Sequence, residues 1–256
     1  MSAETAIERL AQRLIPGAAV TVLTGSGVSA ASGVPTFRGP EGLWRHFKPE
    51  ELATPEAFAR DPRLVWEWYD WRRQKIAACR PNRAHEVLAL WATRYPRFSL
   101  VTQNVDGLHE RAGVADLVRL HGSIWEVSCW NRCKGSPERW LDETVPFPTL
   151  PPTCRYCGGL IRPGVVWFGE PLDGDALARA DRASSCDVFI AAGTSALVYP
   201  AAAFVPLARA RGAFTVEVNP DDTPASGRVD LVIRLGAEVA LDLVEARLQG
   251  TSTAAP

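Results

Sequence analysis

The stretch AAVTVLTG (residues 18–25), followed by SGVSAASGVPTFRG (26–39), decides the fold of this chain. Its first part is an apolar, β-branched run that ends in glycine, which is typical of a buried parallel strand. Residues 25–30 fit the pattern G-x-G-x-x-G/A, whose glycines permit a tight turn and let backbone N–H groups approach a diphosphate. The acidic residue expected about 20 positions later is absent, because 35–48 has the composition of a loop. This absence argues against an ordinary Rossmann dehydrogenase, and a glycine-rich turn that binds nothing stays an open alternative.

Five further segments repeat the pattern of an apolar run followed by small or polar residues. They are RFSLVTQN (97–104), LVRLHGS (117–123), VFIAAGTS (188–195), AFTVEVN (213–219) and DLVIRLG (230–236). Helical periodicity appears in an N-terminal segment with Ile7, Leu10, Leu14 and Ile15, at 50–80, at 82–91 with Asn82 as the expected cap, and at 237–248. This alternation predicts an α/β fold, a Rossmann-like parallel sheet with helices on both faces. The polar strand ends mark the edge where such sheets bind ligands.

Residues 124–163 interrupt this alternation, because they are rich in Cys, Pro and Trp and show little periodicity. We expect an inserted module that is held together by something other than a hydrophobic core. The predicted domain organisation is therefore discontinuous. The Rossmann-like domain takes 1–39, 81–123 and 164–248, the small domain combines a helical module (40–80) with a cysteine-rich module (124–163), and 249–256 form a flexible tail.

Charge and hydropathy limit the partners and the location. The net charge of −1 comes without a dense run of Lys or Arg, so neither nucleic acid nor an anionic membrane is expected as a partner. The N-terminus lacks the uninterrupted apolar stretch of a signal peptide, and no segment approaches the ~20 apolar residues of a membrane span. We expect a cytoplasmic protein, and a monomer.

Four of the six cysteines form the pattern C-x3-C-x20-C-x2-C, at Cys129, Cys133, Cys154 and Cys157. Two close pairs on separate turns can surround Zn²⁺ tetrahedrally, and clustered cysteines in a reducing compartment more often bind metal than form disulfides. Four protein ligands leave no open position, so the predicted zinc is structural. Chance clustering and a zinc-ribbon nucleic-acid module are the alternatives, but Arg132 and Lys134 give the latter too little positive charge. Cys79 and Cys186 are expected to be ordinary buried thiols.

Two polar groups follow predicted strands at the expected ligand edge. His121 lies in LHGS and could act as a general base near neutral pH, although a lone histidine is also common as a structural residue. The run 103–106 (QNVD) offers amides and a carboxylate that could bind ribose hydroxyls and a carboxamide. An Asx turn that opens the next helix is the alternative for this run.

Six motifs, in this order, closely resemble those of the sirtuin family and span roughly residues 15–240. They are GSGVSAASGVPTFRG (25–39), TQNVDGLHERAG (102–113), HGS (121–123), the two cysteine pairs, GVVWFGE (164–170) and GTSALVYPAA (193–202). The resemblance implies an NAD-dependent protein-lysine deacylase with NAD as co-substrate and one structural Zn²⁺. Its substrates would be acyl-lysine proteins or peptides, and its products nicotinamide, free lysine and O-acyl-ADP-ribose.

Matching the motifs position by position assigns roles to single residues. His121 would help to deprotonate a ribose hydroxyl. Val166 to Glu170 would pair with the substrate peptide as a strand, which assigns substrate contacts to Val166, Phe168, Gly169 and Glu170. NAD would be bound by Gly25, Ser26, Gly27, Val28, Ser29, Ala30, Thr36, Phe37, Arg38, Trp44, Gln103, Asn104, Val105, Asp106, Gly193, Thr194, Ser195, Asn219, Pro220, Asp221 and Ala237.

Within this family the chain resembles the class III branch, whose members favour succinyl-, malonyl- or glutaryl-lysine. The resemblance rests on Tyr69 and Arg72, which match the Tyr-x-x-Arg motif of that branch. Residues three apart share a helix face, and a guanidinium with a phenol suits a terminal carboxylate. Three alternatives stay open: a plain deacetylase, a mono-ADP-ribosyltransferase, and a non-catalytic NAD-binding zinc scaffold or sensor.

Overall fold

The structure is a computed structural model that describes residues 1–36 and 48–252. Its larger sheet has the strand order β3-β2-β1-β7-β8-β9. The strands are β1 (Ala19–Thr24), β2 (Arg97–Thr102), β3 (Val118–Arg119), β7 (Val188–Ala192), β8 (Phe214–Val218) and β9 (Leu231–Ile233). All neighbours run parallel, which confirms the predicted Rossmann-like sheet. The chain order reverses between β1 and β7, and such a switch point is where open α/β sheets bind ligands.

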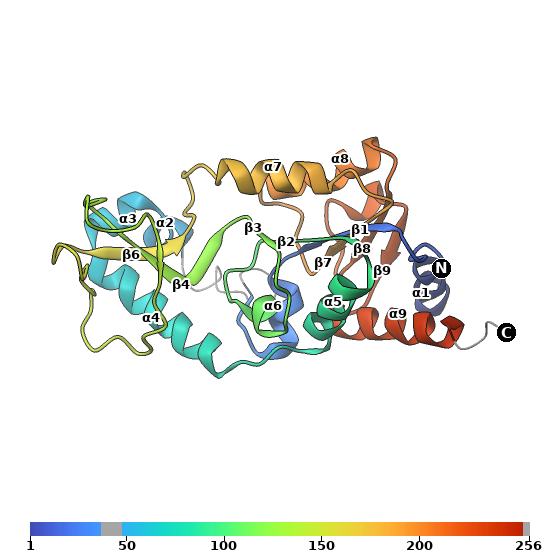
Figure 1. Cartoon of the computed structure of the whole chain (residues 1–256), viewed down its shortest axis with the longest axis horizontal. Coiled ribbons are helices and arrows are strands. Elements are labelled where there is room, and N and C mark those ends of the chain that lie inside the picture. Colours follow the sequence, from blue (N-terminus) through green and yellow to red (C-terminus); the bar gives the residue numbers. More distant parts are fainter. Residues whose placement is uncertain (37–47, 253–256) are drawn as a thin grey trace.

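Helices cover both faces of this sheet, as predicted (Figure 1). On one face lie α1 (Ala3–Ala11), α5 (Arg83–Arg94) and α9 (Ala237–Ser252), and on the other lie α7 (Gly174–Ala183) and α8 (Phe204–Ala210). Because side chains alternate along a strand, Val20 and Val22 of β1 pack with the first group of helices and Leu23 packs with the second. Every residue of β1 is buried, which explains its nearly continuous apolar sequence.

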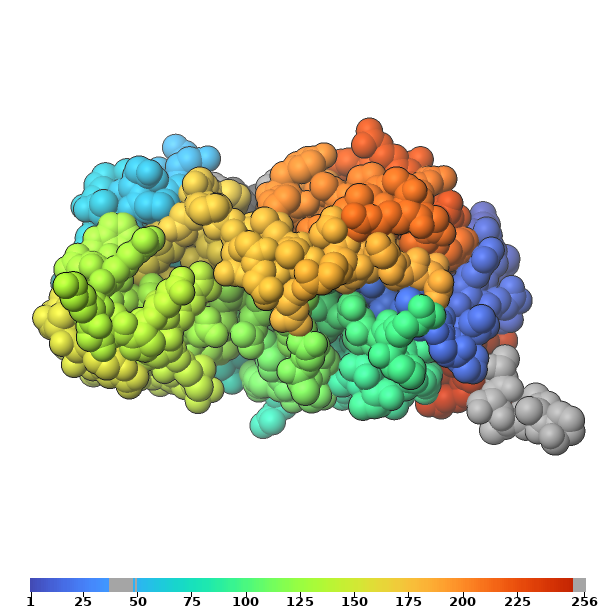
Figure 2. All heavy atoms as spheres, turned by 45° about the horizontal axis from the view of Figure 1, so that its top comes forward, coloured from blue at the N-terminus to red at the C-terminus, as the bar shows by residue number. Residues whose placement is uncertain are grey.

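A smaller unit contains an antiparallel sheet with the order β5-β4-β6. Its strands are β4 (Gly122–Cys129), β5 (Trp140–Leu141) and β6 (Ile161–Val165). Its helices are α2 (Pro49–Leu52), α3 (Pro55–Arg60) and α4 (Pro62–Ala78), whereas the short α6 (Leu108–Arg111) follows β2. Figure 2 shows the chain after β6 crossing the surface from this unit to α7 on the larger sheet.

The single strand predicted over 117–123 is wrong. Val118–Arg119 pair with β2 in the larger sheet, whereas the chain from Gly122 onward pairs with β6 in the smaller one. Gly122 has a φ of +73°, and a Cβ there would collide with the carbonyl group of Gly164. The chain therefore changes sheets at a glycine, because only glycine combines this conformation with such a close backbone approach.

The segment 124–163 has a hydrophobic core, contrary to the prediction. Val127 and Ile161 of its strands are buried with Phe58 and Trp66 of α3 and α4. The indole Nε1 of Trp66 also donates a 2.7 Å hydrogen bond to the carbonyl oxygen of Ile161. This core shows no periodicity within 124–163, because half of it comes from helices that are distant in the sequence.

The predictions for the cap of α5, for the N-terminal helix and for the turn after β1 had different outcomes. Asn82 caps α5 as predicted, since its side chain accepts a hydrogen bond from the backbone N–H of Ala84 at 3.0 Å. The N-terminal helix ends at Ala11, so Ile15 lies beyond it and is 60% exposed, which the amphipathic pattern did not predict. The predicted turn after β1 contains the 3-10 helix η1 (Ser26–Ser32). Across the described part of the chain, no helix is long and apolar enough to cross a membrane.

Candidate functional site

A cavity of about 480 Å³ lies at the carboxyl ends of β1, β2 and β7 and extends to the smaller unit. Its walls come from the loops after these strands, from α4 and from the segment after β6. The cavity unites predicted site residues that are far apart in the sequence. These are Gly25, Ser26, Tyr69, Arg72, Gln103, Asn104, Val105, His121, Val166, Phe168, Gly169, Glu170, Gly193, Thr194 and Ser195.

Other residues predicted to bind the cofactor do not line this cavity. Val28 and Ser29 are completely buried, and Ala237 is buried in the core at the start of α9. Asn219 supports the wall, because its Nδ2 donates a 2.9 Å hydrogen bond to the carbonyl oxygen of Thr194. The described residues that also do not line the cavity are Gly27, Ala30, Thr36, Asp106, Pro220 and Asp221. Three further predicted residues, Phe37, Arg38 and Trp44, lie outside the described residues.

The loops after β1 and β7 meet backbone to backbone. A Cβ on Gly27 would lie 2.8 Å from the Cα of Gly193, and one on Gly25 would lie 2.7 Å from the Gly193 carbonyl oxygen. Gly193 itself has a φ of +59°, in the left-handed region that favours glycine. The glycines predicted to admit a diphosphate therefore also allow the two loops to approach each other.

A buried hydrogen-bond network fixes the loop after β1. Ser29 Oγ donates to Asp106 Oδ2 at 2.8 Å, and Asn104 Nδ2 donates to the Gly25 carbonyl oxygen at 3.1 Å and to Ser29 Oγ at 3.2 Å. Burial raises the pKa of Asp106, although hydrogen bonds from the Leu108 backbone and from Ser29 oppose this rise. The network connects the residues after β2 to the glycine-rich loop, so both loops are held in one arrangement.

Two histidines extend this network away from the cavity, and neither was predicted from the sequence. His85 Nε2 lies 3.3 Å from Ser29 Oγ, and His109 Nε2 lies 3.0 Å from Thr24 Oγ1. Burial lowers the pKa of His85 to about 3, with a further contribution from His109, and lowers the pKa of His109 to about 4. Both rings are therefore neutral near pH 7 and support the loop without carrying charge. His109 lies within TQNVDGLHERAG, which was the available signal.

His121 reaches the cavity from the junction between the two sheets. Its Nδ1 lies 3.0 Å from the carbonyl oxygen of Gln103. A carbonyl oxygen only accepts, so Nδ1 carries the proton and Nε2 keeps a free lone pair. Burial lowers the pKa of His121, and the hydrogen bond to Gln103 opposes this. The ring is thus a neutral imidazole near pH 7, which is the form that accepts a proton.

Tyr69 and Arg72 share a face of α4 and are both buried at the cavity wall. The guanidinium carbon of Arg72 lies 4.8 Å from the ring centroid of Trp68 and 5.7 Å from that of Tyr69. Burial lowers the pKa of Arg72, but Tyr69 and Asp106 oppose this, and a guanidinium is basic enough to stay charged. Burial raises the pKa of Tyr69, while the Arg72 charge opposes the rise. The wall therefore presents a cation and a protonated phenol.

Two tryptophans of the wall, Trp68 and Trp167, were not predicted as site residues. Trp167 Nε1 donates a 2.9 Å hydrogen bond to the hydroxyl oxygen of Tyr69. Trp167 stands inside the GVVWFGE motif, which was the available signal. Phe168 is tied to the smaller unit, because its backbone N–H donates a 2.9 Å hydrogen bond to the carbonyl oxygen of Ala53.

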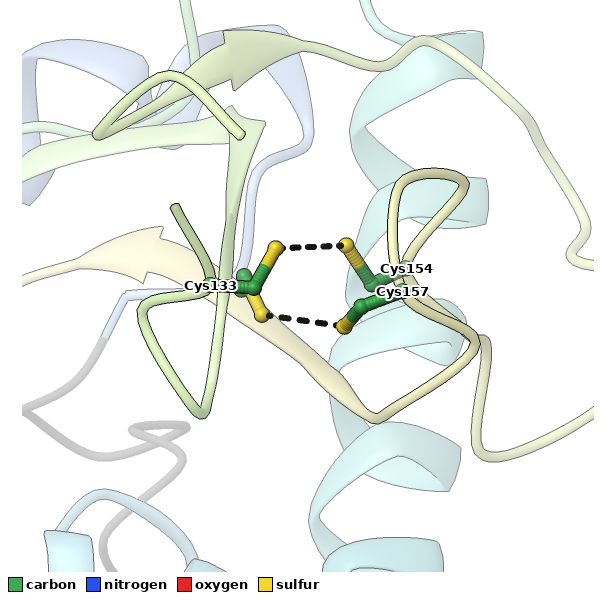
Figure 3. A group of neighbouring side chains, drawn as sticks. Cys133, Cys154 and Cys157 are labelled. Atoms are coloured by element: carbon green, nitrogen blue, oxygen red, sulfur yellow. Dashed lines mark hydrogen bonds between the residues drawn. The ribbon is translucent and has the colours of Figure 1, made fainter. Parts of the chain in front are cut away.

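Four cysteine thiols converge in the smaller unit, as predicted (Figure 3). Their sulfur atoms lie within 4.8 Å of one another, with 3.7 Å between Cys129 and Cys157 and 4.0 Å between Cys133 and Cys154. Sulfur ligands at ~2.3 Å from a tetrahedral Zn²⁺ are separated by roughly 3.8 Å. The donor set and its geometry therefore fit one structural zinc.

Comparison with known proteins gives consistent matches. A model of the Sir2 family matches residues 25–200. The NAD-dependent protein deacylase of Aquifex aeolicus is 53% identical over 226 residues, which cover 88% of this chain and 93% of that protein. A solved complex of a Sir2 homolog with NAD is similar with a TM-score of 0.83 at 44% identity, covering 95% of this chain and 94% of the other.

A second solved structure is a Sir2 variant with a deacetylated p53 peptide and 3′-O-acetyl ADP-ribose. It is similar to this chain with a TM-score of 0.84 at 30% identity, and the match covers 94% of this chain and 98% of the other.

Proposed function

This chain belongs to the Sir2 family and is an NAD-dependent protein deacylase of the sirtuin type, and we propose that it prefers lysines that carry acidic acyl groups. Succinyl- and malonyl-lysine are the proposed main substrates. Glutaryl-lysine belongs to the same chemical class, and acetyl-lysine is a secondary substrate. The proposal assigns this chain to the class III branch of the family.

One observation carries the acidic preference: the buried guanidinium of Arg72 lines the same cavity as His121. A guanidinium forms charge-assisted, bidentate hydrogen bonds with a carboxylate, so an acyl group that ends in a carboxylate can pair with Arg72. The hydroxyl of Tyr69 adds a hydrogen-bond donor on the same helix face. An acetyl group ends in a methyl and makes use of neither group.

The other residues of the cavity have separable tasks. NAD supplies the ADP-ribose that accepts the acyl group and releases nicotinamide. We propose that the loop that begins at Gly25 binds the phosphates and that the loop that begins at Gly193 lines the adenosine end. The 103–106 run would hold the nicotinamide ribose and carboxamide. His121 takes a proton at Nε2, because its Nδ1 is committed to Gln103. The 166–170 segment, anchored to Ala53, binds the peptide backbone.

The four cysteines hold the zinc at a distance from this chemistry. With four protein ligands the ion has no open coordination position, so it stabilises the smaller unit and does not activate a substrate. We further propose a monomer in the cytoplasm that acts on acyl-lysine proteins and not on nucleic acid, in keeping with the net charge of −1.

The test is a competition between acetyl, malonyl, succinyl and glutaryl versions of one peptide in the presence of NAD. Arg72→Met should lower kcat/KM for the succinyl peptide by about 10- to 100-fold, the effect of losing a charge-assisted hydrogen bond, and leave deacetylation largely intact. Arg63→Met is a matched control, because Arg63 lies on the same helix with its side chain 72% exposed. Equal losses on both peptides would refute the acidic preference and favour a plain deacetylase.

A further inference from the structure

The hydrogen bond between Trp167 and Tyr69 has a forced direction. An indole N–H can only donate, so the hydroxyl oxygen of Tyr69 is the acceptor across the 2.9 Å contact. The hydroxyl proton of Tyr69 must then point to a different acceptor. Within residues 1–36 and 48–252 no group accepts that proton, although the side chain is only 2% exposed and lines the cavity.

The indole that sets this direction is itself immobilised. The guanidinium carbon of Arg162 lies 3.7 Å from the ring centroid of Trp167. Arg162 is held by Glu170 through two hydrogen bonds of 2.5 and 2.8 Å, and Glu170 also accepts the backbone N–H of Trp167 at 2.8 Å. Phe58 packs at 5.4 Å between ring centroids. Trp167 is thus fixed by stacking and by a closed set of hydrogen bonds, so it cannot readily swing away from Tyr69.

A fixed hydroxyl matters for an acidic acyl group. A phenol donates one hydrogen bond and also accepts, whereas an ionised carboxylate only accepts. The Trp167 N–H occupies one acceptor position of the Tyr69 oxygen, so the hydroxyl proton turns away from Trp167 and can be donated to a carboxylate that also meets Arg72. An acetyl methyl gains nothing from this arrangement.

We propose that Trp167 is a positioning residue for acyl selectivity, which acts by committing the Tyr69 hydroxyl to donate toward the terminal carboxylate of the acyl group. This inference rests on the proposed preference for acidic acyl groups. It assigns a separate part of that preference to a residue outside the Tyr-x-x-Arg pair.

A double-mutant cycle with Trp167→Phe, Tyr69→Phe and both together tests it, with kcat/KM measured on succinyl and acetyl forms of one peptide. Trp167→Phe should lower the ratio of kcat/KM for the succinyl peptide to kcat/KM for the acetyl peptide by about tenfold, mostly through the KM of the succinyl peptide. In the Tyr69→Phe background, Trp167→Phe should have almost no further effect on desuccinylation. Near-UV circular dichroism shows whether the variants are folded.

Trp130→Phe is the matched control, because Trp130 packs in the same aromatic cluster, 6.4 Å from Trp167 between ring centroids. It should leave the selectivity unchanged. Additive effects of Trp167→Phe and Tyr69→Phe, or equal losses on both peptides, would overturn the role of Trp167. The Arg72→Met variant separates the two proposals. If Arg72→Met leaves desuccinylation unchanged, the acidic preference itself is wrong. If Arg72→Met selectively lowers desuccinylation but the effects of Trp167→Phe and Tyr69→Phe are additive, only the Trp167 proposal is wrong.

Discussion

His121 owes its proposed role to one carbonyl group and to burial. The Gln103 carbonyl fixes the tautomer, and burial lowers the pKa below its ordinary value of 6.5. A base works only when it is unprotonated, so a lowered pKa extends activity toward lower pH. The acid limb of kcat/KM against pH, measured with an acetyl peptide, should therefore have its midpoint below 6.5. His121→Ala should lose at least about 100-fold in kcat/KM. A midpoint above 6.5, or an active His121→Ala variant, would contradict the assignment.

Single site residues were predictable where a motif displayed them. His121 lies in a family motif and the cysteines have a metal-ligand spacing; the structure places His121 at the cavity and the four sulfur atoms together, and the catalytic role of His121 stays a prediction. The proposed role of Trp167 could not be predicted in the same way, because it depends on a hydrogen bond to Tyr69, which is distant in the sequence. His85 likewise looks like an ordinary helix residue until Ser29 is placed beside it.

At the scale of elements, α5 and α9 are joined by a buried carboxylate. Glu245 of α9 is 1% exposed and accepts hydrogen bonds from Trp91 Nε1 at 2.9 Å and from Arg94 Nη1 at 2.7 Å. Burial alone would raise its pKa, but the hydrogen bonds from Arg94, Trp91 and Gln249 lower it. Glu245 therefore stays ionised in the folded protein and holds two helices together.

Glu245→Ala should lower the free energy of unfolding by about 1–3 kcal/mol, because the buried Trp91 N–H loses its acceptor. Urea unfolding of the zinc-loaded protein measures this. Asp242→Ala, on the same helix, removes only a surface pair with Arg83 and should cost less than about 1 kcal/mol. An equal cost for the two variants would show that the buried carboxylate contributes no more than the exposed one.

Elements of the larger sheet were predictable because each strand is apolar and ends at small or polar residues. The boundary at 117–123 was misjudged for a physical reason. The apolar pattern continues through both β3 and β4, whereas the change of sheet depends on the contact between Gly122 and Gly164. A tertiary contact of this kind produces no periodic pattern in the sequence.

For the whole molecule, zinc and the smaller core depend on each other. Cys129 and Cys154 are buried in the same cluster as Phe58 and Trp66, so the metal and the helical module share one core. Loss of zinc should unfold the smaller unit and displace Tyr69, while the parallel sheet keeps its separate cores.

Chelation of zinc, or Cys154→Ser, should therefore abolish deacylation and shift tryptophan emission to longer wavelength. The shift is diagnostic, because of the tryptophans in the described ranges only Trp91 packs on the larger sheet. Cys186 lies outside the cysteine cluster, so Cys186→Ser should change neither deacylation nor tryptophan emission. Unchanged emission and activity after the metal is shown to have left would refute a structural role for it.

The contact between Gly27 and Gly193 also bears on engineering. Because the two loops are in backbone contact, a side chain at either glycine requires the other loop to move away. The conformations of the two loops therefore depend on each other. A library that aims at altered co-substrate analogues should keep both glycines and vary the neighbouring Ser26 and Thr194 together. A side chain placed at Gly27 or Gly193 alone would clash with the backbone of the other loop, whatever its chemistry.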